Sequence, residues 1–129
     1  MDRIVSLFKQ SKNISALLGA GMSTSAGLPD FRSSEGVYEK LQKDYNFNLP
    51  SPEALYDINY FRKNPVPYFT FSGKKGYRAM SPTKAHSFIF MLEQLEILNL
   101  AVTQNIDGLE KRAGVTKLVE LHGNTSTAS

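Results

Sequence analysis

Apolar residues in this sequence form short uninterrupted runs that alternate with stripes at helical spacing. The runs ISALL (14–18), ILNLAVT (97–103) and KLVEL (117–121) predict three buried strands. The clearest stripe follows Ser81-Pro82, a pair that is typical of a helix start. Its apolar positions, which we expect to face the core, are Ala85, Phe88, Ile89, Leu92 and Leu95. Strand and helix therefore alternate, which favours an α/β fold with a parallel sheet and right-handed crossovers.

Two shorter patterns predict further helices around this core. An amphipathic opening helix is indicated by apolar residues at i, i+3 and i+4 spacing. These residues are Ile4, Leu7 and Phe8. The stretch DGLEKRAG (107–114) predicts a short helix between the second and third strands, with Asp107 as its cap, Glu110 at the capping-box position and a terminal glycine.

The segment between the first two strands is too long for a simple crossover. Within it, Ser51-Pro52 predicts a helix start, and Pro65 marks its end, because the residue before a proline is pushed out of the helical region. The inward positions of this helix are Leu55, Ile58 and Phe61. The stretch SGKKGYRAMS (72–81) is typical of a basic, solvated loop. We therefore predict a Rossmann-like part at 1–33 and 82–129, with 34–81 as an inserted helical or lid segment.

Composition narrows the class of protein. The chain has 129 residues, 41% of them hydrophobic and 21% charged, which suits one globular domain. The net charge is only +3 and the basic residues are scattered, so nucleic acid is not the expected partner. No apolar run approaches the ~20 residues of a membrane span, and the first residues lack the apolar centre of a secretory signal. We therefore expect an intracellular protein.

The cysteine count bears on metals and disulfides. The sequence has no cysteine and only two histidines, His86 and His122. Disulfides are therefore excluded, and one chain cannot build a four-ligand Cys/His zinc site.

Polar clusters stand where each predicted strand ends. GAGMS follows the first strand, TQNID the second and HG the third. In an open parallel sheet the carboxyl ends of the strands form the ligand crevice. The three clusters are therefore expected to face one site, and this convergence is more specific than any single cluster.

The first cluster has the character of a phosphate-binding turn. Gly19 and Gly21, with Ala20 between them, let backbone N–H groups approach a pyrophosphate, and Ser23 and Thr24 can donate to it. The alternative is a tight strand-to-helix turn without a ligand. Thr24 stands where G-x-G-x-x-G has its third glycine, and no acidic residue follows about 20 residues later, so hydride transfer is disfavoured.

Two further groups suit a nucleotide. Asp30-Phe31-Arg32 offers a carboxylate, an aromatic face and a guanidinium for one flat ring and one anionic group, although a surface ion pair beside a core phenylalanine would look the same. Gln104, Asn105 and Asp107 can hold a ribose hydroxyl or a carboxamide. The capping role of Asp107 is compatible with this one.

The two histidines receive different interpretations. His122 lies at the carboxyl end of a predicted strand and can accept a proton at neutral pH, which suits a general base. A hydrogen-bonded structural histidine is the alternative. For His86, inside the amphipathic helix, the structural role is the prediction.

The order of these motifs resembles that of the sirtuin family, the NAD-dependent protein-lysine deacylases. The resemblance rests on GAGMS, AGLPDFRS, PEALYDINYFRKNP, SPTKAH, TQNIDGL and LVELHG, and covers nearly the whole chain. It implies a Rossmann-like domain with an inserted helical and zinc module. It also implies transfer of the acetyl group of acetyl-lysine proteins to ADP-ribose, with release of nicotinamide.

The resemblance also assigns residues by matching motif. The phosphates of NAD would be held by Gly19, Ala20, Gly21 and Ser23. The nicotinamide and ribose region would be lined by Asp30, Phe31 and Arg32, and ribose and carboxamide gripped by Gln104, Asn105, Ile106 and Asp107. The predicted catalytic residues are His122, as general base, and Asn105.

The sequence departs from the family after the HG motif. Relatives carry two CxxC pairs for structural zinc there, whereas this chain has no zinc ligands of that kind and stops at Ser129. We therefore expect a partial sirtuin catalytic domain over residues 1–129, without the zinc module. A parallel sheet of only three strands would expose an apolar edge that invites self-association or a partner chain.

Two other functions stay open at this point. One is a non-catalytic fragment that binds NAD or a partner. The other is a different dinucleotide-domain enzyme, such as the central domain of a thiamine-diphosphate decarboxylase, which TQNID and HG together disfavour. The nucleus or the cytoplasm is the expected location, and acyl-group preference is left open.

Overall fold

The chain folds into two compact units in a computed structural model. Residues 2–30, 34, 36–44, 47–75 and 80–125 are described. The first unit comprises Met1–Ala26 and Ser81–Ser129, and the second comprises Gly27–Met80. Each unit is built around its own group of buried apolar side chains.

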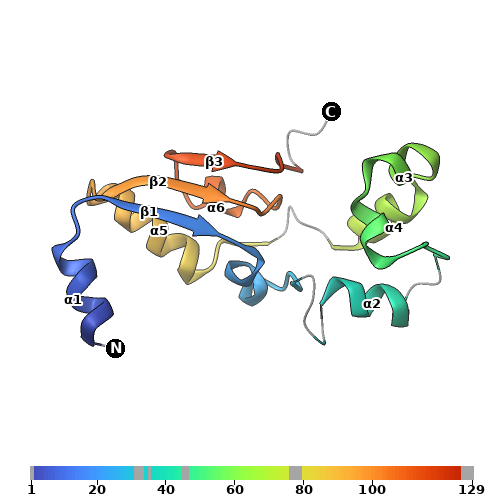
Figure 1. The fold of residues 1–129 in the computed structure, drawn as a ribbon, viewed down its shortest axis with the longest axis horizontal. Coiled ribbons are helices and arrows are strands. Elements are labelled where there is room, and N and C mark those ends of the chain that lie inside the picture. The colour runs from blue at the N-terminus through green and yellow to red at the C-terminus, as the bar shows by residue number, and fades with distance from the viewer. Residues whose placement is uncertain (1, 31–33, 35, 45–46, 76–79, 126–129) are drawn as a thin grey trace. The chain divides into compact units, whose positions relative to one another are not determined.

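A three-stranded parallel sheet forms the first unit (Figure 1). Its strands are β1 (Ile14–Leu18), β2 (Leu98–Thr103) and β3 (Leu118–Glu120), in the order β1-β2-β3. Leu18 pairs with Thr103, and Thr103 pairs with Glu120, so the three strands end at the same edge. The predicted parallel α/β fold is confirmed.

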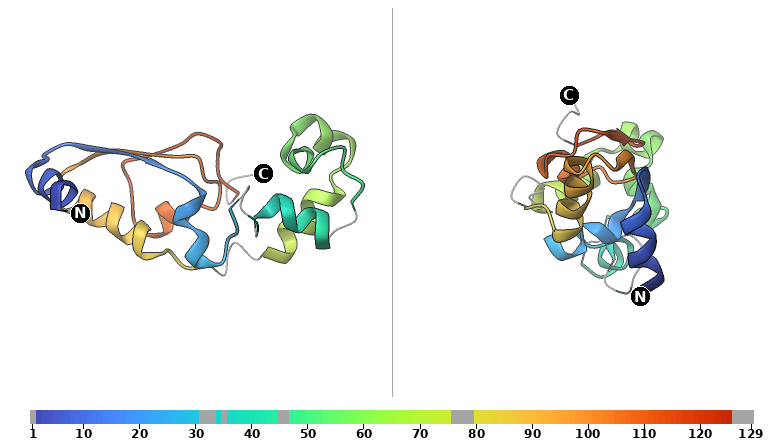
Figure 2. Two further views of the ribbon diagram at one scale, coloured as in Figure 1. Left: turned by 60° about the horizontal axis from the view of Figure 1, so that its bottom comes forward. Right: turned by 90° about the vertical axis from the view of Figure 1, so that its left-hand side faces the viewer.

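Helix α5 (Lys84–Gln94) packs against β2 and supplies the core on one face of the sheet (Figures 1 and 2). The buried residues of this core are Leu18, Ile89, Leu92, Leu98, Ala101 and Val115. The helix begins after Thr83 rather than Ser81, because Thr83 and His86 satisfy each other's backbone as a capping box. Phe88 and Leu95 are exposed, contrary to the predicted inward stripe.

Helix α1 (Asp2–Gln10) forms as predicted, but its apolar residues stay exposed. The ring of Phe8 meets the ring of Phe88 edge-on at 5.7 Å between centroids. Phe88 therefore packs against α1 rather than in the core of the first unit. The amphipathic pattern thus predicts the helix, but its apolar side chains are not buried against another element.

The short helix α6 (Leu109–Arg112) differs from its prediction at the start. Its N-cap residue is Gly108, whose φ of 69° lies in the left-handed region that favours glycine. Asp107 still caps the turn, since its Oδ1 accepts a hydrogen bond from the Leu109 N–H at 2.9 Å. Glu110 points into the core instead of closing a capping box, so that part of the prediction is wrong.

The second unit is helical. It contains α2 (Val37–Asp44), the 3-10 turn η3 (Pro52–Tyr56), α3 (Ile58–Lys63) and α4 (Val66–Lys75). Its core is made of Val37, Leu41, Leu55 and Phe71. The helix predicted from Ser51 is interrupted at Asp57, whose carboxylate caps α3 by accepting from the Tyr60 N–H. Ile58 is consequently exposed, and α4 runs into the stretch that was predicted as a basic loop.

Among the described residues, no helix has the length and apolar character needed to cross a membrane.

Candidate functional site

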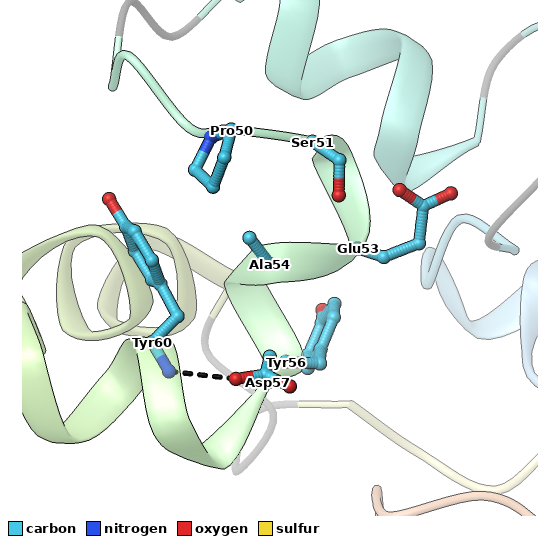
Figure 3. Close-up of a pocket in the computed structure, with 7 residues that line it drawn as sticks. All are labelled: Pro50, Ser51, Glu53, Ala54, Tyr56, Asp57 and Tyr60. Carbon is cyan, nitrogen blue, oxygen red and sulfur yellow. Dashed lines mark hydrogen bonds between the residues drawn. The ribbon is translucent and has the colours of Figure 1, made fainter.

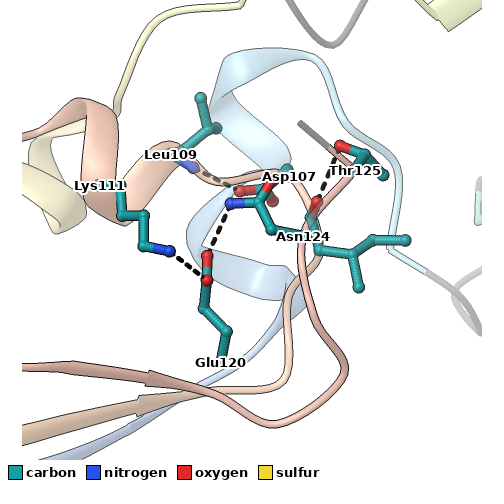
Figure 4. Close-up of polar contacts among 7 residues, drawn as sticks. Asp107, Leu109, Lys111, Glu120, Asn124 and Thr125 are labelled. Atoms are coloured by element: carbon teal, nitrogen blue, oxygen red, sulfur yellow. Dashed lines mark hydrogen bonds and ion pairs between the residues drawn. The ribbon is translucent and has the colours of Figure 1, made fainter. Parts of the chain in front are cut away.

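The loops that follow the three strands lie against one another at the carboxyl edge of the sheet. The Nδ2 atom of Asn105 donates to the carbonyl oxygen of Gly19 at 3.1 Å, which ties the second loop to the first. Thr125 donates to the carbonyl oxygen of Ile106 from both its N–H and its hydroxyl, each at 3.0 Å, which ties the third loop to the second (Figure 4). The expected convergence of the three polar clusters is therefore observed.

The glycine turn after β1 leaves open space above its backbone. Gly19 is the N-cap of the 3-10 turn η1 (Ala20–Met22), and its φ of −143° is extended backbone that any residue adopts. A Cβ atom built on Gly19 or Gly21 would meet no other atom of the described residues within 4 Å. Packing against the described residues therefore does not require glycine at these positions, and close approach of a ligand to the backbone stays a prediction.

Ser23 is turned inward at this site. Its exposed fraction is 1% and its Oγ donates to Oδ2 of Asp107 at 2.8 Å. The neighbouring Thr24, in the 3-10 turn η2 (Thr24–Ala26), donates instead to the carbonyl oxygen of Gly21. Both hydroxyl protons are thus used within the chain, and contacts of these residues with phosphate stay a prediction.

The second loop presents its residues at different depths. Asn105 is buried, Ile106 and Asp107 are half-buried, and Gln104 is exposed. The N–H of Gln104 donates to the carbonyl oxygen of Leu18 at 3.1 Å, which continues the sheet pairing into the loop. The loop therefore has a fixed backbone, with Gln104 directed to solvent.

The turn after β3 carries His122, whose side chain is exposed. It is held by contacts on either side: Glu120 accepts from Asn124 Nδ2 at 2.7 Å and forms an ion pair with Lys111 (Figure 4). Asn124 also lies close over Gly108, where an added Cβ would come within 2.6 Å of its Nδ2. Sequence reasoning did not select Glu120 or Asn124, although the polar stretch after LVEL was the available signal.

A buried cluster of ionisable groups lies beneath the second loop. Potential ligand atoms of His86, Asp107 and Glu110 lie within 4.8 Å of one another. Burial lowers the pKa of His86 below its ordinary value, and the nearby carboxylates of Glu110 and Asp107 oppose this by raising it. The structural role predicted for His86 agrees with its complete burial, but the pattern gave no sign of its acidic neighbours.

The remaining predicted site residues belong to the second unit. The carbonyl oxygen of Asp30 accepts from the Val37 N–H at 2.7 Å at the start of α2. Phe31 and Arg32 lie outside the described residues. The same unit contains an open cavity of about 470 Å³, on which the tyrosine rings and carboxylates of η3 and α3 border (Figure 3). Its lining residues are Pro50, Ser51, Glu53, Ala54, Tyr56, Asp57 and Tyr60.

Comparison with known proteins decides the family. A model of the Sir2 family matches residues 19–129. The chain belongs to the Sir2 family. The NAD-dependent histone deacetylase sirtuin-1 of Drosophila melanogaster is 45% identical to it over 99% of its length, and the NAD-dependent deacetylase sir2D of Dictyostelium discoideum is 48% identical over 99%. The chain spans only 15% and 24% of these two relatives, respectively.

Solved Sir2 structures share the fold of this chain. A Sir2 protein in complex with deacetylated p53 peptide and 3'-O-acetyl ADP ribose matches with a TM-score of 0.79 and 35% identity. A Sir2 homologue in complex with ADP ribose matches with the same TM-score and 32% identity. Each match covers 96% of this chain and 47% of the other chain. The sirtuin resemblance and the Rossmann-like class predicted from the sequence are confirmed.

The residues present fit one family ligand and not another. The open glycine turn and the polar loops beside it suit the phosphates, ribose and carboxamide of NAD. The sequence has no cysteine, so cysteine ligands for a zinc module would have to come from outside these 129 residues.

Proposed function

We propose that this chain provides the NAD-facing part of a protein-lysine deacetylase site. The observation that carries the proposal is the meeting of three polar loops at the carboxyl edge of a Sir2-family sheet, beside a glycine turn open to a ligand. Bound NAD would supply ADP-ribose as the acceptor of the acetyl group and nicotinamide as the leaving group. The substrates would be acetylated lysine proteins or peptides, in the nucleus or the cytoplasm.

The glycine turn would hold the phosphates. Its backbone N–H groups, at Gly19, Ala20 and Gly21, can approach a phosphate oxygen, because the space that a Cβ would take on either glycine is free of the other described residues. Ser23 would act beside them and keep Asp107 in place through its hydroxyl.

The second loop would hold the ribose and the carboxamide, and the third loop would supply the group that accepts a proton. Gln104, Ile106 and Asp107 would contact the nicotinamide side, and Asn105 would orient the sugar from its position above Gly19. An exposed ring nitrogen of His122 would accept the proton of a ribose hydroxyl. Asp30, Phe31 and Arg32 would line the nicotinamide and ribose region, with 34–81 as the inserted helical segment.

Calorimetry with NAD on the purified chain tests the proposal. We expect binding that Asn105→Ala weakens and His122→Ala leaves nearly unchanged, because a general base acts in the chemical step rather than in binding. In any version of this protein that deacetylates an acetyl-lysine peptide, His122→Ala should abolish turnover. A chain that binds no NAD, or full deacetylation by His122→Ala, would contradict the proposal.

A second function, partner binding, is supported by the sheet face opposite α5. Leu17, Val102 and Val119 pair across the three strands on this face, and Leu17 is 70% exposed. Both faces of parallel sheets are usually covered. We propose that this face binds a second protein surface, either another copy of the chain or a partner chain.

Light scattering after size-exclusion chromatography separates these outcomes. Self-association should appear as a mass that rises with concentration, and Leu17→Lys should return it to that of one chain. A well-folded monomer at all concentrations would speak against this second function.

A further inference from the structure

Glu110 has no role in the proposed function, yet its side chain is completely buried, with an exposed fraction of 0%. Removal of a carboxylate from water is strongly unfavourable unless hydrogen bonds replace its hydration. An acidic residue that only favours the start of a helix can act from the surface. The burial of Glu110 therefore points to a specific task inside the domain.

One carboxylate oxygen of Glu110 is joined to Asn105 through Thr103. The hydroxyl of Thr103 donates to Glu110 Oε1 at 2.6 Å, and the N–H of Asn105 donates to the same hydroxyl oxygen at 3.1 Å. A hydroxyl has a single proton, so acceptance by Glu110 fixes the direction in which its lone pairs face. Those lone pairs are thereby held toward the backbone of Asn105.

The other carboxylate oxygen of Glu110 makes no hydrogen bond with the described residues. Glu110 Oε2 and His86 Nε2 are both buried, and neither has a hydrogen-bond partner among the described residues. The ligand atoms of these two residues and of Asp107 lie within 4.8 Å of one another. A donor on the ring and an acceptor on the carboxylate would satisfy both groups together.

The cap of α5 bears on which ring nitrogen carries the proton. The N–H of Thr83 donates to His86 Nδ1 at 3.1 Å. The hydroxyl oxygen of Thr83 lies 2.8 Å from the same nitrogen and 2.9 Å from the carbonyl oxygen of Met22, and it has one proton for these two acceptors. A proton on Nε2 is the arrangement in which the N–H of Thr83 keeps its acceptor.

Asn105 is the end of this network that faces the ligand. Its side chain donates to the carbonyl oxygen of Gly19 and so joins the second loop to the glycine turn. The orientation of that side chain depends on where the Asn105 backbone lies, and the backbone N–H is held by Thr103.

We propose that Glu110 is a positioning residue for Asn105, acting through Thr103. Its consequence for NAD rests on the proposed function. The arrangement of the relay itself does not, because it concerns contacts within the chain.

Amide exchange of the ¹⁵N-labelled chain, followed by NMR, tests the relay without any ligand. Thr103→Val removes the hydroxyl and Thr103→Ser keeps it. We expect exchange of the Asn105 amide to accelerate about tenfold or more in Thr103→Val and to stay near wild type in Thr103→Ser. The Ala101 amide lies in the same strand as Thr103 and donates to the carbonyl oxygen of Lys117. Its exchange rate corrects for any change in global stability.

Substitution at Glu110 gives a second readout. Glu110→Gln replaces one acceptor oxygen of the carboxylate by an NH₂ donor, so either the Thr103 hydroxyl or the ring of His86 then faces a donor. We expect the Asn105 amide resonance to shift and the ¹⁵N signals of His86 to leave the Nε2–H pattern. Glu93→Gln, which alters a carboxylate bound to Thr116 instead, should change neither.

The outcomes are distinct. If the Asn105 amide follows Ala101 in Thr103→Val and Glu110→Gln, the relay is refuted. Calorimetry then adds NAD: Thr103→Val should weaken binding about tenfold relative to Thr103→Ser. A wild-type chain that binds no NAD would refute the proposed function while exchange still decides the relay.

Discussion

Ser23 and Asp107 are separated by 84 positions in the sequence, yet the hydroxyl of Ser23 donates to the Asp107 carboxylate at 2.8 Å. The same carboxylate caps α6 through the Leu109 N–H. One acidic side chain thus fixes the glycine turn after β1 and the start of the helix after β2. This pairing makes the two loops one structural unit.

Ser23→Ala should therefore destabilise the chain. A buried hydrogen bond to a charged acceptor is lost, and we expect the free energy of unfolding to fall by about 1–3 kcal/mol. Urea unfolding followed by circular dichroism measures this. For Thr24→Ala, which loses only an exposed hydrogen bond to the carbonyl oxygen of Gly21, the free energy of unfolding should fall by less than about 0.5 kcal/mol. Equal effects of the two variants would contradict the interpretation.

Gly21→Ala should separate ligand binding from stability. A methyl group at this position meets no atom of the described residues within 4 Å, so the free energy of unfolding in urea should change by less than about 1 kcal/mol. The same methyl group would stand between the backbone and a phosphate, and calorimetry should show weaker binding of NAD. A loss of stability without a loss of binding would mean that this glycine serves the fold alone.

Gly108→Ala should show the opposite behaviour to Gly21→Ala. Its φ of 69° strains any residue with a Cβ, and that Cβ would displace Asn124 from its bond to Glu120. We expect a loss of about 1–3 kcal/mol in the free energy of unfolding. Thermal unfolding of both glycine variants in one buffer gives the comparison, and a Gly108→Ala protein as stable as wild type would show that the turn adapts.

The buried His86 should make stability depend on pH. Burial lowers its pKa in the folded chain, so the unfolded chain takes up the proton first as the pH falls. The free energy of unfolding should therefore decrease as the pH falls from about 6.5, the ordinary pKa of histidine, to the lowered pKa of His86 in the folded chain. Stability above that pH should be unaffected by this group.

Urea unfolding at about pH 7.5 and about pH 5.5 measures this dependence. His86→Gln should flatten it, whereas His122→Gln, a change at an exposed ring, should keep it. Hydrogen bonds from Thr116 lower the pKa of Glu93, whose contribution is lost only at more acidic pH, so it does not enter this interval. A wild-type slope retained by His86→Gln would contradict the assignment.

The sequence by itself determined the sheet and the edge at which the site lies. ISALL, ILNLAVT and KLVEL are mostly apolar, which predicts strands of a parallel sheet, and the polar clusters behind them had to meet because parallel strands end together. The prediction that the strands are buried is wrong for much of β1 and for β3, because Leu17 is 70% exposed and no residue of β3 is buried. The glycine turn, the second loop and His122 could be located for the same reason. These signals are local, since each depends on a few neighbouring residues.

Tertiary structure decided what the side chains of that edge do. Ser23 turned inward because Asp107 lies across from it, and Glu110 left its capping position because Thr103 and His86 surround it in the core. Phe88 and Leu95 stayed exposed because the sheet covers only one side of α5. Contacts between residues far apart in sequence set these outcomes, because burial and hydrogen-bond partners are properties of the assembled fold rather than of any single segment.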